Sequence, residues 1–382
     1  MRRLMVLVLL FVGFAATAGA QIGKSVSVAA GTDEDNALSA IYAAPDGPEK
    51  VALLDKFMAD FGKGDLELLG DQLYEQTYLA QKNYAKVYEY GEKALKLDPD
   101  NLSTTVNLIH AADEQGDVQK LFGYGEKVAG IITRFQAAPP PEGTPPEQWP
   151  SQRKQALQDA QQDIMYVQGA MVGAAFKTTN ATARAALCER FAAAFPDSPY
   201  AAPVRDQIAF SYQQAQNFPK MLEAAQKNLA TDPNDISMLV LLADNWSESG
   251  QQLDKASASA QKALELLGKA QKPENVTDEQ WQRQITIQKG LAYSSLGQVY
   301  VNKDQNAQAV DAFKQAGPLL KSDSVSYARN LYRLGFTLAK MQRTAEARVV
   351  LTEAVSINSP YRSRAQETLD KIGGKKPARK AS

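Results

Sequence analysis

The chain has 382 residues, of which 44% are hydrophobic, and its 42 Lys and Arg residues nearly balance its 43 Asp and Glu residues. The hydrophobic share is large enough for a folded core, and the even charge balance argues against nucleic-acid binding, which requires a basic surplus. The only histidine, His110, and the only cysteine, Cys188, exclude a zinc site of Cys and His ligands and a disulfide framework. We therefore expect no metal and no cofactor.

Residues 1–20 have the pattern of a secretory signal peptide. Arg2 and Arg3 precede an apolar run, and Ala18–Ala20 has the small-residue form of a cleavage site. The apolar run is shorter than the roughly 20 residues that a membrane-spanning helix needs. We expect cleavage before Gln21, no membrane span in the mature chain, and a periplasmic or secreted protein. The alternative is an uncleaved leader that serves as a membrane anchor.

A short motif recurs in the first half of the chain. Tyr90–Lys93, with the sequence Tyr-Gly-Glu-Lys, returns as Tyr124–Lys127. Asp98-Pro99 follows the first copy and predicts a helix end, because proline cannot continue a helix and aspartate favours turns. Asp232-Pro233 repeats this stop.

A longer period aligns Lys50–Phe61 with Arg184–Phe195, and the same offset pairs Asn83 with Asn217. We interpret this as a duplicated helical module. Convergence of two unrelated segments on one helical pattern is the alternative. Cys188 occupies the place of a leucine in the first copy, so we expect a buried and unreactive thiol.

The middle of the chain contains two insertions. The first is rich in proline and is expected to be an extended spacer or, alternatively, a docking peptide. We predict that Ser151 caps one long helix that runs to about Lys177, and that Thr179 or Asn180 begins the next. In the second insertion, Thr277-x-x-Gln280 is a capping box that begins another helix.

Two stretches near the C-terminus align with each other without gaps. They read Leu296-Gly297-x2-Tyr300-x8-Ala309-x3-Phe313-x2-Ala316 and Leu334-Gly335-x2-Leu338-x8-Ala347-x3-Leu351-x2-Ala354. This pattern resembles the tetratricopeptide repeat, a helix–turn–helix unit. The small residues suit two antiparallel helices that cross closely, and the larger residues fill the space beside them. The resemblance implies an all-α fold, a right-handed α-solenoid closed by a C-terminal capping helix.

The expected segments follow the chain in order. They are the signal peptide at 1–20, a partly disordered leader at 21–46 with a short helix near Asp33 to Ala43, a first repeat module at 47–136, the Pro-rich loop at 137–150, a second, duplicated module at 151–270, an insertion loop at 271–282, two clear repeats at 283–360, a capping helix at 361–374 and a basic tail at 375–382. We expect the tail to be a solvated end, with a contact to acidic lipid or a partner as the alternative.

The resemblance also implies that the first helix of each repeat lines a concave groove that binds a protein or peptide. The groove residues expected on this basis are Ser294, Gln298, Asn302, Arg329, Tyr332, Phe336, Lys340, Gln72, Gln76, His110 and Gln213. This set is rich in amides and aromatics but lacks the ring of Lys, Arg and Asn with which some family members clamp a peptide carboxylate. It favours a neutral or mixed segment or a partner helix. The alternative for aromatic members such as Phe336 is a place in the core between repeats.

These observations favour a non-enzymatic interaction scaffold or adaptor of the cell envelope. Any imidazole-based catalysis would need His110, and no catalytic pattern surrounds it. A membrane-tethered envelope assembly factor is the second hypothesis. An accessory protein of an enzyme that uses paired carboxylates is the third, and no motif places such a pair. The identity of the partner and the oligomeric state do not follow from the sequence.

Overall fold

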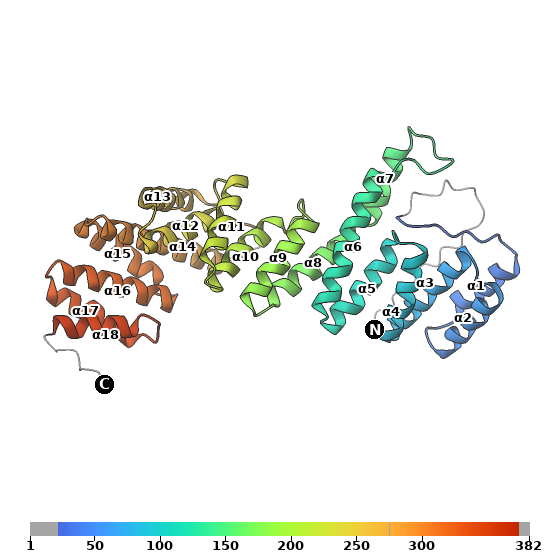
Figure 1. Cartoon of the computed structure of the whole chain (residues 1–382), viewed down its shortest axis with the longest axis horizontal. Coiled ribbons are helices and arrows are strands. Elements are labelled where there is room, and N and C mark those ends of the chain that lie inside the picture. Colours follow the sequence, from blue (N-terminus) through green and yellow to red (C-terminus); the bar gives the residue numbers. More distant parts are fainter. Residues whose placement is uncertain (1–21, 275, 374–382) are drawn as a thin grey trace. The chain divides into compact units, whose positions relative to one another are not determined.

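The computed structural model describes residues 22–274 and 276–373, and this part of the chain forms eighteen α-helices and no β-strand (Figure 1). It divides into two compact units, the first ending at Ser211 and the second beginning at Tyr212. The all-α, helical-repeat fold expected from the sequence is therefore confirmed. The helices are α1 (Asp33–Ala43), α2 (Pro48–Phe61), α3 (Asp65–Ala80), α4 (Tyr84–Leu97), α5 (Leu102–Gln115), α6 (Val118–Ala137), α7 (Trp149–Asp159), α8 (Gln161–Lys177), α9 (Ala181–Ala194), α10 (Ala201–Gln214), α11 (Phe218–Thr231), α12 (Ile236–Ser249), α13 (Leu253–Lys269), α14 (Asp278–Asn302), α15 (Asn306–Leu320), α16 (Ser324–Lys340), α17 (Thr344–Ser356) and α18 (Arg362–Ile372).

The first unit is built from successive helix pairs that pack against each other and against the next pair. α3 packs on α4, α5 on α6, and α8 on α9, while α4 also contacts α5. Its largest core contains Phe122, Met171 and Phe191, all fully buried. Cys188 lies in the same core, and burial raises the pKa of its thiol to about 12. The expectation of a buried thiol is therefore confirmed.

The two sequence copies share helix bounds, caps and an aromatic pair in the structure, while their origin by duplication stays a prediction. The bounds of α4 and α11 differ by the same offset as the two sequence copies, and so do those of α5 and α12. The side chains of Asn83 and Asn217 each accept a hydrogen bond from a backbone N–H in the first turn of the following helix, which satisfies an otherwise unpaired donor. The rings of Phe57 and Phe61 lie 5.7 Å apart, and the corresponding pair at 191 and 195 lies 5.6 Å apart.

Two boundaries differ from the sequence prediction. The single helix expected from Ser151 to Lys177 is two helices, because the chain breaks at Ala160 between α7 and α8. α7 begins earlier than predicted, at Trp149, and has Pro150 in its first turn, where a missing N–H carries no penalty. The second insertion is also shorter than expected, since its last residues form the start of α14.

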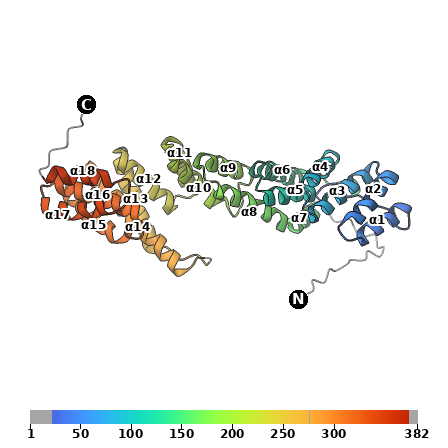
Figure 2. The same ribbon diagram turned by 90° about the horizontal axis from the view of Figure 1, so that it is seen from below.

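The helix predicted from the Thr277 capping box is confirmed. The Thr277 side chain accepts from the Gln280 backbone N–H, and the Gln280 side chain accepts from the Thr277 backbone N–H. The helix that follows, α14, has 25 residues, and its first turns extend beyond α12 and α13 (Figure 2). Asn180 caps α9, so one of the two residues expected to begin this helix, Thr179 or Asn180, is confirmed.

The leader contains the expected short helix, α1, which the side chain of Thr32 caps. The predicted signal peptide and the basic tail from Lys375 lie outside the described residues. Within the described residues, no helix is both long and apolar enough to cross a membrane. The predicted capping helix is present as α18, which packs on α16 and α17.

The second unit shows why the repeats need glycine at the helix crossing. A Cβ atom on Gly297 would lie 2.5 Å from the Phe313 ring, and a Cβ atom on Gly335 would lie 2.5 Å from Cγ of Leu351. Both distances are far shorter than a van der Waals contact. The expectation is confirmed at these positions: each glycine permits the close helix crossing, and Phe313 or Leu351 fills the space beside it.

Glu75 on α3 is a fully buried acid in the first unit. Asn107 donates to its Oε2 at 3.2 Å, while its Oε1 has no hydrogen-bond partner among the described residues. Burial raises the pKa of Glu75 to about 8, although hydrogen bonds from Asn107 and Thr104 oppose the shift. The folded chain therefore binds a proton at Glu75 that the unfolded chain releases near pH 4.5.

We expect this site to make stability fall as the pH rises. Between about pH 4.5 and pH 8 the folded state holds more protons than the unfolded state, so the stabilisation from protonated Glu75 is lost across this window. Glu75→Gln should flatten the decline in melting temperature between pH 5 and pH 8, whereas exposed Glu147→Gln should not. An unchanged pH profile in Glu75→Gln would contradict the assignment.

Candidate functional site

Three first helices of successive repeats, α12, α14 and α16, form a row in the second unit in which neighbours contact each other. A pocket of about 190 Å³ opens beside this row. Its wall includes three of the residues expected in the groove, Gln298, Tyr332 and Phe336, together with Tyr361 and Arg364 at the start of α18. The structure thus brings part of the predicted site together and adds the capping helix to it.

Aromatic rings form one side of the pocket. The Tyr332 ring lies 6.2 Å from the Phe336 ring and 6.2 Å from the Tyr361 ring. Both spacings are within the range of favourable ring contacts. Phe336 is 45% exposed, whereas Tyr332 is half-buried and also packs on the core of the last repeat. Phe336 therefore presents a large apolar surface to the solvent, and Tyr332 packs both against its ring and against the core.

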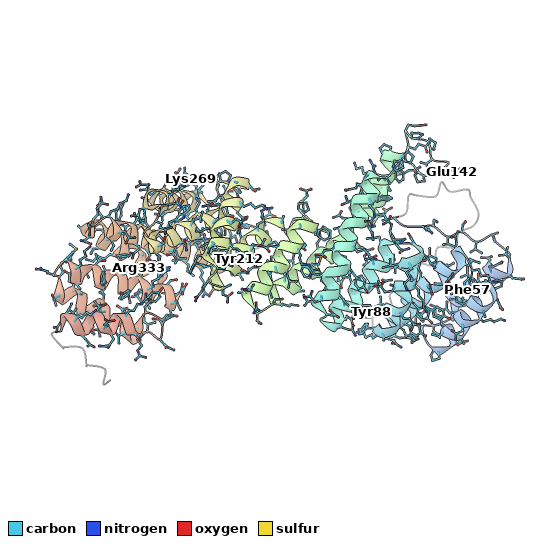
Figure 3. All side chains as sticks on the ribbon, in the orientation of Figure 1. Phe57, Tyr88, Glu142, Tyr212, Lys269 and Arg333 are labelled. Atoms are coloured by element: carbon cyan, nitrogen blue, oxygen red, sulfur yellow. The ribbon has the colours of Figure 1, made fainter. Side chains whose placement is uncertain are left out.

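A buried ion-pair network lies behind the aromatic residues, and Figure 3 marks one of its members, Arg333. Arg329 donates to Oδ2 of Asp244 at 2.8 Å, and a second Asp244 oxygen lies 3.8 Å from the Arg333 guanidinium. Arg333 also donates to Glu248 and, at 3.2 Å, to Ser294. Two acids one turn apart on α12 thus face two arginines one turn apart on α16.

Burial and charge act against each other in this network. Burial alone would raise the pKa of Asp244, but the guanidinium groups of Arg329 and Arg333 lower it below its usual value. Burial and the neighbouring Arg329 lower the pKa of Arg333. The carboxylates of Asp244 and Glu248 oppose this shift but do not cancel it. The Glu248 side chain is half exposed and lines the pocket. The network therefore fixes a carboxylate and a guanidinium at the edge of the pocket.

The remaining predicted residues of the second unit lie around this site with different roles. Arg329 differs from the expectation of a groove residue, because it is turned inward and forms a largely buried ion pair with Asp244. Ser294 is also buried, beside Arg333. Asn302 donates to the Ser247 carbonyl at 2.6 Å, and exposed Lys340 pairs with Asp304. Gln213 is half-buried on α10, away from the pocket wall.

The predicted residues of the first unit lie on α3 and α5 and do not join the pocket. His110 is half-buried, and its ring stacks on Tyr166 at 3.9 Å. The Tyr166 hydroxyl donates to Asp113 at 3.1 Å. Burial lowers the pKa of His110, and acidic neighbours, first Asp163 and then Asp113, oppose the shift. On α3, Gln72 is half-buried and Gln76 is exposed.

No group of three or more His, Cys, Asp or Glu side chains that could hold a metal ion occurs within the described residues.

Sequence reasoning missed the charged half of the site. Asp244 and Glu248 are four residues apart on one helix, and Arg329 and Arg333 are four residues apart on another. Two acids and two arginines, each pair at helical spacing, are a signal that the sequence contains. Arg364 had no such signal, because its place depends on how α18 packs on α16.

Comparison with known proteins agrees with this architecture. The family model described as tetratricopeptide repeat matches residues 328–361, which cover most of α16 and all of α17. No curated protein sequence matches the chain significantly.

Three solved structures match the chain with low sequence identity. They are the crystal structures of the APC/C hetero-tetramer Cut9–Hcn1 (16% identity, TM-score 0.45, covering 89% of this chain and 64% of that one), yeast Tom70 (11%, 0.37, 82% and 65%) and the P58(IPK) TPR domain (11%, 0.32, 90% and 98%). The chain thus spans slightly less than two thirds of the first two. The family match identifies a tetratricopeptide repeat at residues 328–361, in the second unit.

Proposed function

We propose that the protein is a non-enzymatic scaffold of the cell envelope, which holds a segment of a partner protein against the row formed by α12, α14 and α16. The single observation that carries the proposal is the pocket beside Phe336. An exposed aromatic ring at the edge of a pocket suits an interaction site, because aromatic residues contribute much of the binding energy at protein interfaces. Proteins with this fold bind protein partners. The envelope location rests on the pattern of residues 1–20.

The pocket suits one side chain of a partner. Its volume of about 190 Å³ corresponds to roughly six water molecules at about 30 Å³ each, which one aromatic or large aliphatic side chain can displace. The aromatic rings of Tyr332, Phe336 and Tyr361 would cover that side chain. The polar groups of Gln298 and Glu248 at the margin would pair with the partner backbone or with its polar side chains. A neutral or mixed segment therefore fits, as expected from the sequence.

Tyr332→Ala should weaken partner binding by about 1–2 kcal/mol or more, because it removes the ring that supports Phe336. The matched control is Tyr327→Ala on the same helix. Tyr327 is also half-buried, but its hydroxyl donates to Glu353 at 2.7 Å and it does not line the pocket. The mature protein is first used to capture partners from the envelope fraction. The dissociation constant between the captured protein and each variant is then measured at a temperature well below the melting temperatures of both variants.

The two variants separate binding from folding. The proposal requires that Tyr332→Ala lose capture while it is still folded and that Tyr327→Ala keep it. If Tyr332 served only the core between repeats, both variants would lower the melting temperature, and both would bind normally when folded. That second result would show that Tyr332 and the pocket take no part in partner binding.

A further inference from the structure

Glu75 occupies the crossing of α3 with α4 and α5, which lie side by side in the first unit (Figure 1). Glu75 is 0% exposed, and the two neighbouring helices close directly on its carboxyl group. A Cβ atom on Gly91 of α4 would lie 2.7 Å from Oε1 of Glu75 and 2.7 Å from the Leu108 side chain of α5. Glycine at position 91 therefore makes room for an acid at this crossing.

The second sequence copy fills the corresponding positions with apolar residues. At the offset of the two copies, the counterparts of Glu75, Gly91, Thr104 and Asn107 are four buried residues, Ala209, Ala225, Met238 and Leu241. The same helix pattern thus forms with apolar side chains at these positions. An acid at position 75 is therefore not a requirement of the repeat.

No charged side chain within the described part of the chain compensates Glu75. Asn107 donates to its Oε2 at 3.2 Å, and its Oε1 has no hydrogen-bond partner there. Burial raises the pKa of Glu75, and hydrogen bonds from Asn107 and Thr104 oppose the shift. Charged and titratable groups on the surrounding helices interact with other partners: Asp55 with the Tyr74 hydroxyl, Asp71 with Lys93, Glu92 with the Tyr124 hydroxyl and His110 with the Tyr166 ring.

Ionisation of Glu75 would place a negative charge with one unpaired oxygen at this crossing. A buried charge without a partner is strongly unfavourable, so the charged form needs water. Water can reach the carboxyl group only when α4 or α5 moves away from α3. An exposed carboxyl group returns to its ordinary pKa of 4.5, so opening releases the proton and becomes more favourable as the pH rises to about 8.

We propose that Glu75, Thr104 and Asn107 form a proton-dependent latch in the first unit: α4 and α5 stay packed on α3 while Glu75 carries a proton, and the crossing opens locally when the carboxyl group ionises. The opening separates the rings of Tyr74 and Tyr90, which stack across α3 and α4 at 4.3 Å. Tyr74 is 3% exposed in the closed form, so the open form gains an aromatic surface. The latch does not depend on the partner-binding pocket of the second unit.

The latch predicts local opening, which differs from the loss of overall stability that any buried acid would cause. Hydrogen exchange of the full chain, followed by mass spectrometry between pH 6.5 and pH 8, measures this opening once each rate is corrected for the intrinsic exchange rate at that pH. The protection factors of the amides in α3, α4 and α5 should fall about tenfold across this window. Those in α8 and α9 of the same unit should stay nearly constant.

This pH window separates Glu75 from two other groups on the same helices. Burial raises the pKa of Asp71 to about 6, so above pH 6.5 Asp71 is largely ionised in the closed form as well as in the open form. Burial lowers the pKa of His110 from 6.5, so His110 is largely neutral in both forms. The change in protection across the window therefore reports on Glu75.

Glu75→Gln removes the ionisable group but keeps the size of the side chain, and it should make the protection of α3, α4 and α5 independent of pH. Glu67→Gln is the matched control, because Glu67 is exposed on the same helix, and it should keep the tenfold fall. Circular dichroism verifies that both variants are folded, and the comparison of helices in the native chain still decides if Glu75→Gln does not fold. Constant protection of α3, α4 and α5 in the native chain, an equal fall in α8 and α9, or an unchanged fall in Glu75→Gln would overturn the proposal.

Discussion

Replacing Asp244 with alanine is expected to destabilise the second unit by about 3–5 kcal/mol, the usual result of removing one partner from a buried ion pair. Arg329 and Arg333 would keep their charges, because a guanidinium group does not lose its proton in proteins. Their side chains, 16% and 5% exposed, would then hold those charges largely away from solvent. No other acid replaces the contact that Arg329 makes at 2.8 Å among the described residues. Urea denaturation followed by circular dichroism measures the loss.

Asp254→Ala is the matched control for this prediction. Asp254 also pairs with a cation, Lys303 at 2.6 Å, but its side chain is 96% exposed, and exposed pairs contribute about 0–1 kcal/mol. Adding Arg329→Met to Asp244→Ala should recover part of the loss, because it removes the stranded charge. Similar losses in Asp244→Ala and Asp254→Ala would show that the network is not buried as described.

The Asp244 network also predicts a pH dependence opposite to that of Glu75. Because its folded pKa is lowered, the stabilisation from Asp244 is present above the unfolded value of about 3.8 and is lost as the pH falls through the folded pKa. The native protein should therefore lose stability at strongly acidic pH, and the Asp244→Ala variant should lose less of it there.

Gly335→Leu is expected to lower stability by about 1–3 kcal/mol or more, because the new side chain overpacks a close helix crossing. Its Cβ alone would lie 2.5 Å from Cγ of Leu351 and 3.2 Å from the Val350 side chain. Neither neighbour can move far, since Leu351 is fully buried in the core of the last repeat. Thermal melting by circular dichroism measures the effect.

Gly268→Leu makes the same chemical change in another helix of the second unit. Gly268 lies in α13 with nothing within 4 Å of its Cβ position, so leucine there should be neutral or slightly stabilising. If both glycine variants melted alike, the repeat register that places Gly335 at the crossing would be wrong.

Local signals made much of the fold predictable. The caps at Asn180 and Thr277 were readable because each satisfies a backbone donor three residues further along the chain. The crossings at Gly297 and Gly335 were readable because a repeat places the same small residue at the same point. By contrast, no proline or glycine marks the break at Ala160, which depends on how α8 packs on α5 and α6.

The candidate site was predictable only in its aromatic half. Tyr332 and Phe336 lie four residues apart on one helix, so their shared face follows from helix geometry. Arg329 has the same spacing to Arg333, but its partner Asp244 is 85 residues away, and only the packing of α12 beside α16 decides which way it points.

Photo-cross-linking at the pocket can show whether a partner segment binds beside α16. A photoreactive phenylalanine analogue replaces Phe336 in one sample and Val349 in the other, and both are exported and irradiated in the envelope. Val349 on α17 is 69% exposed, against 45% for Phe336, but does not line the pocket. We expect a discrete cross-linked partner from position 336 and none from position 349. The absence of any product at 336, or the same products at both positions, would contradict it.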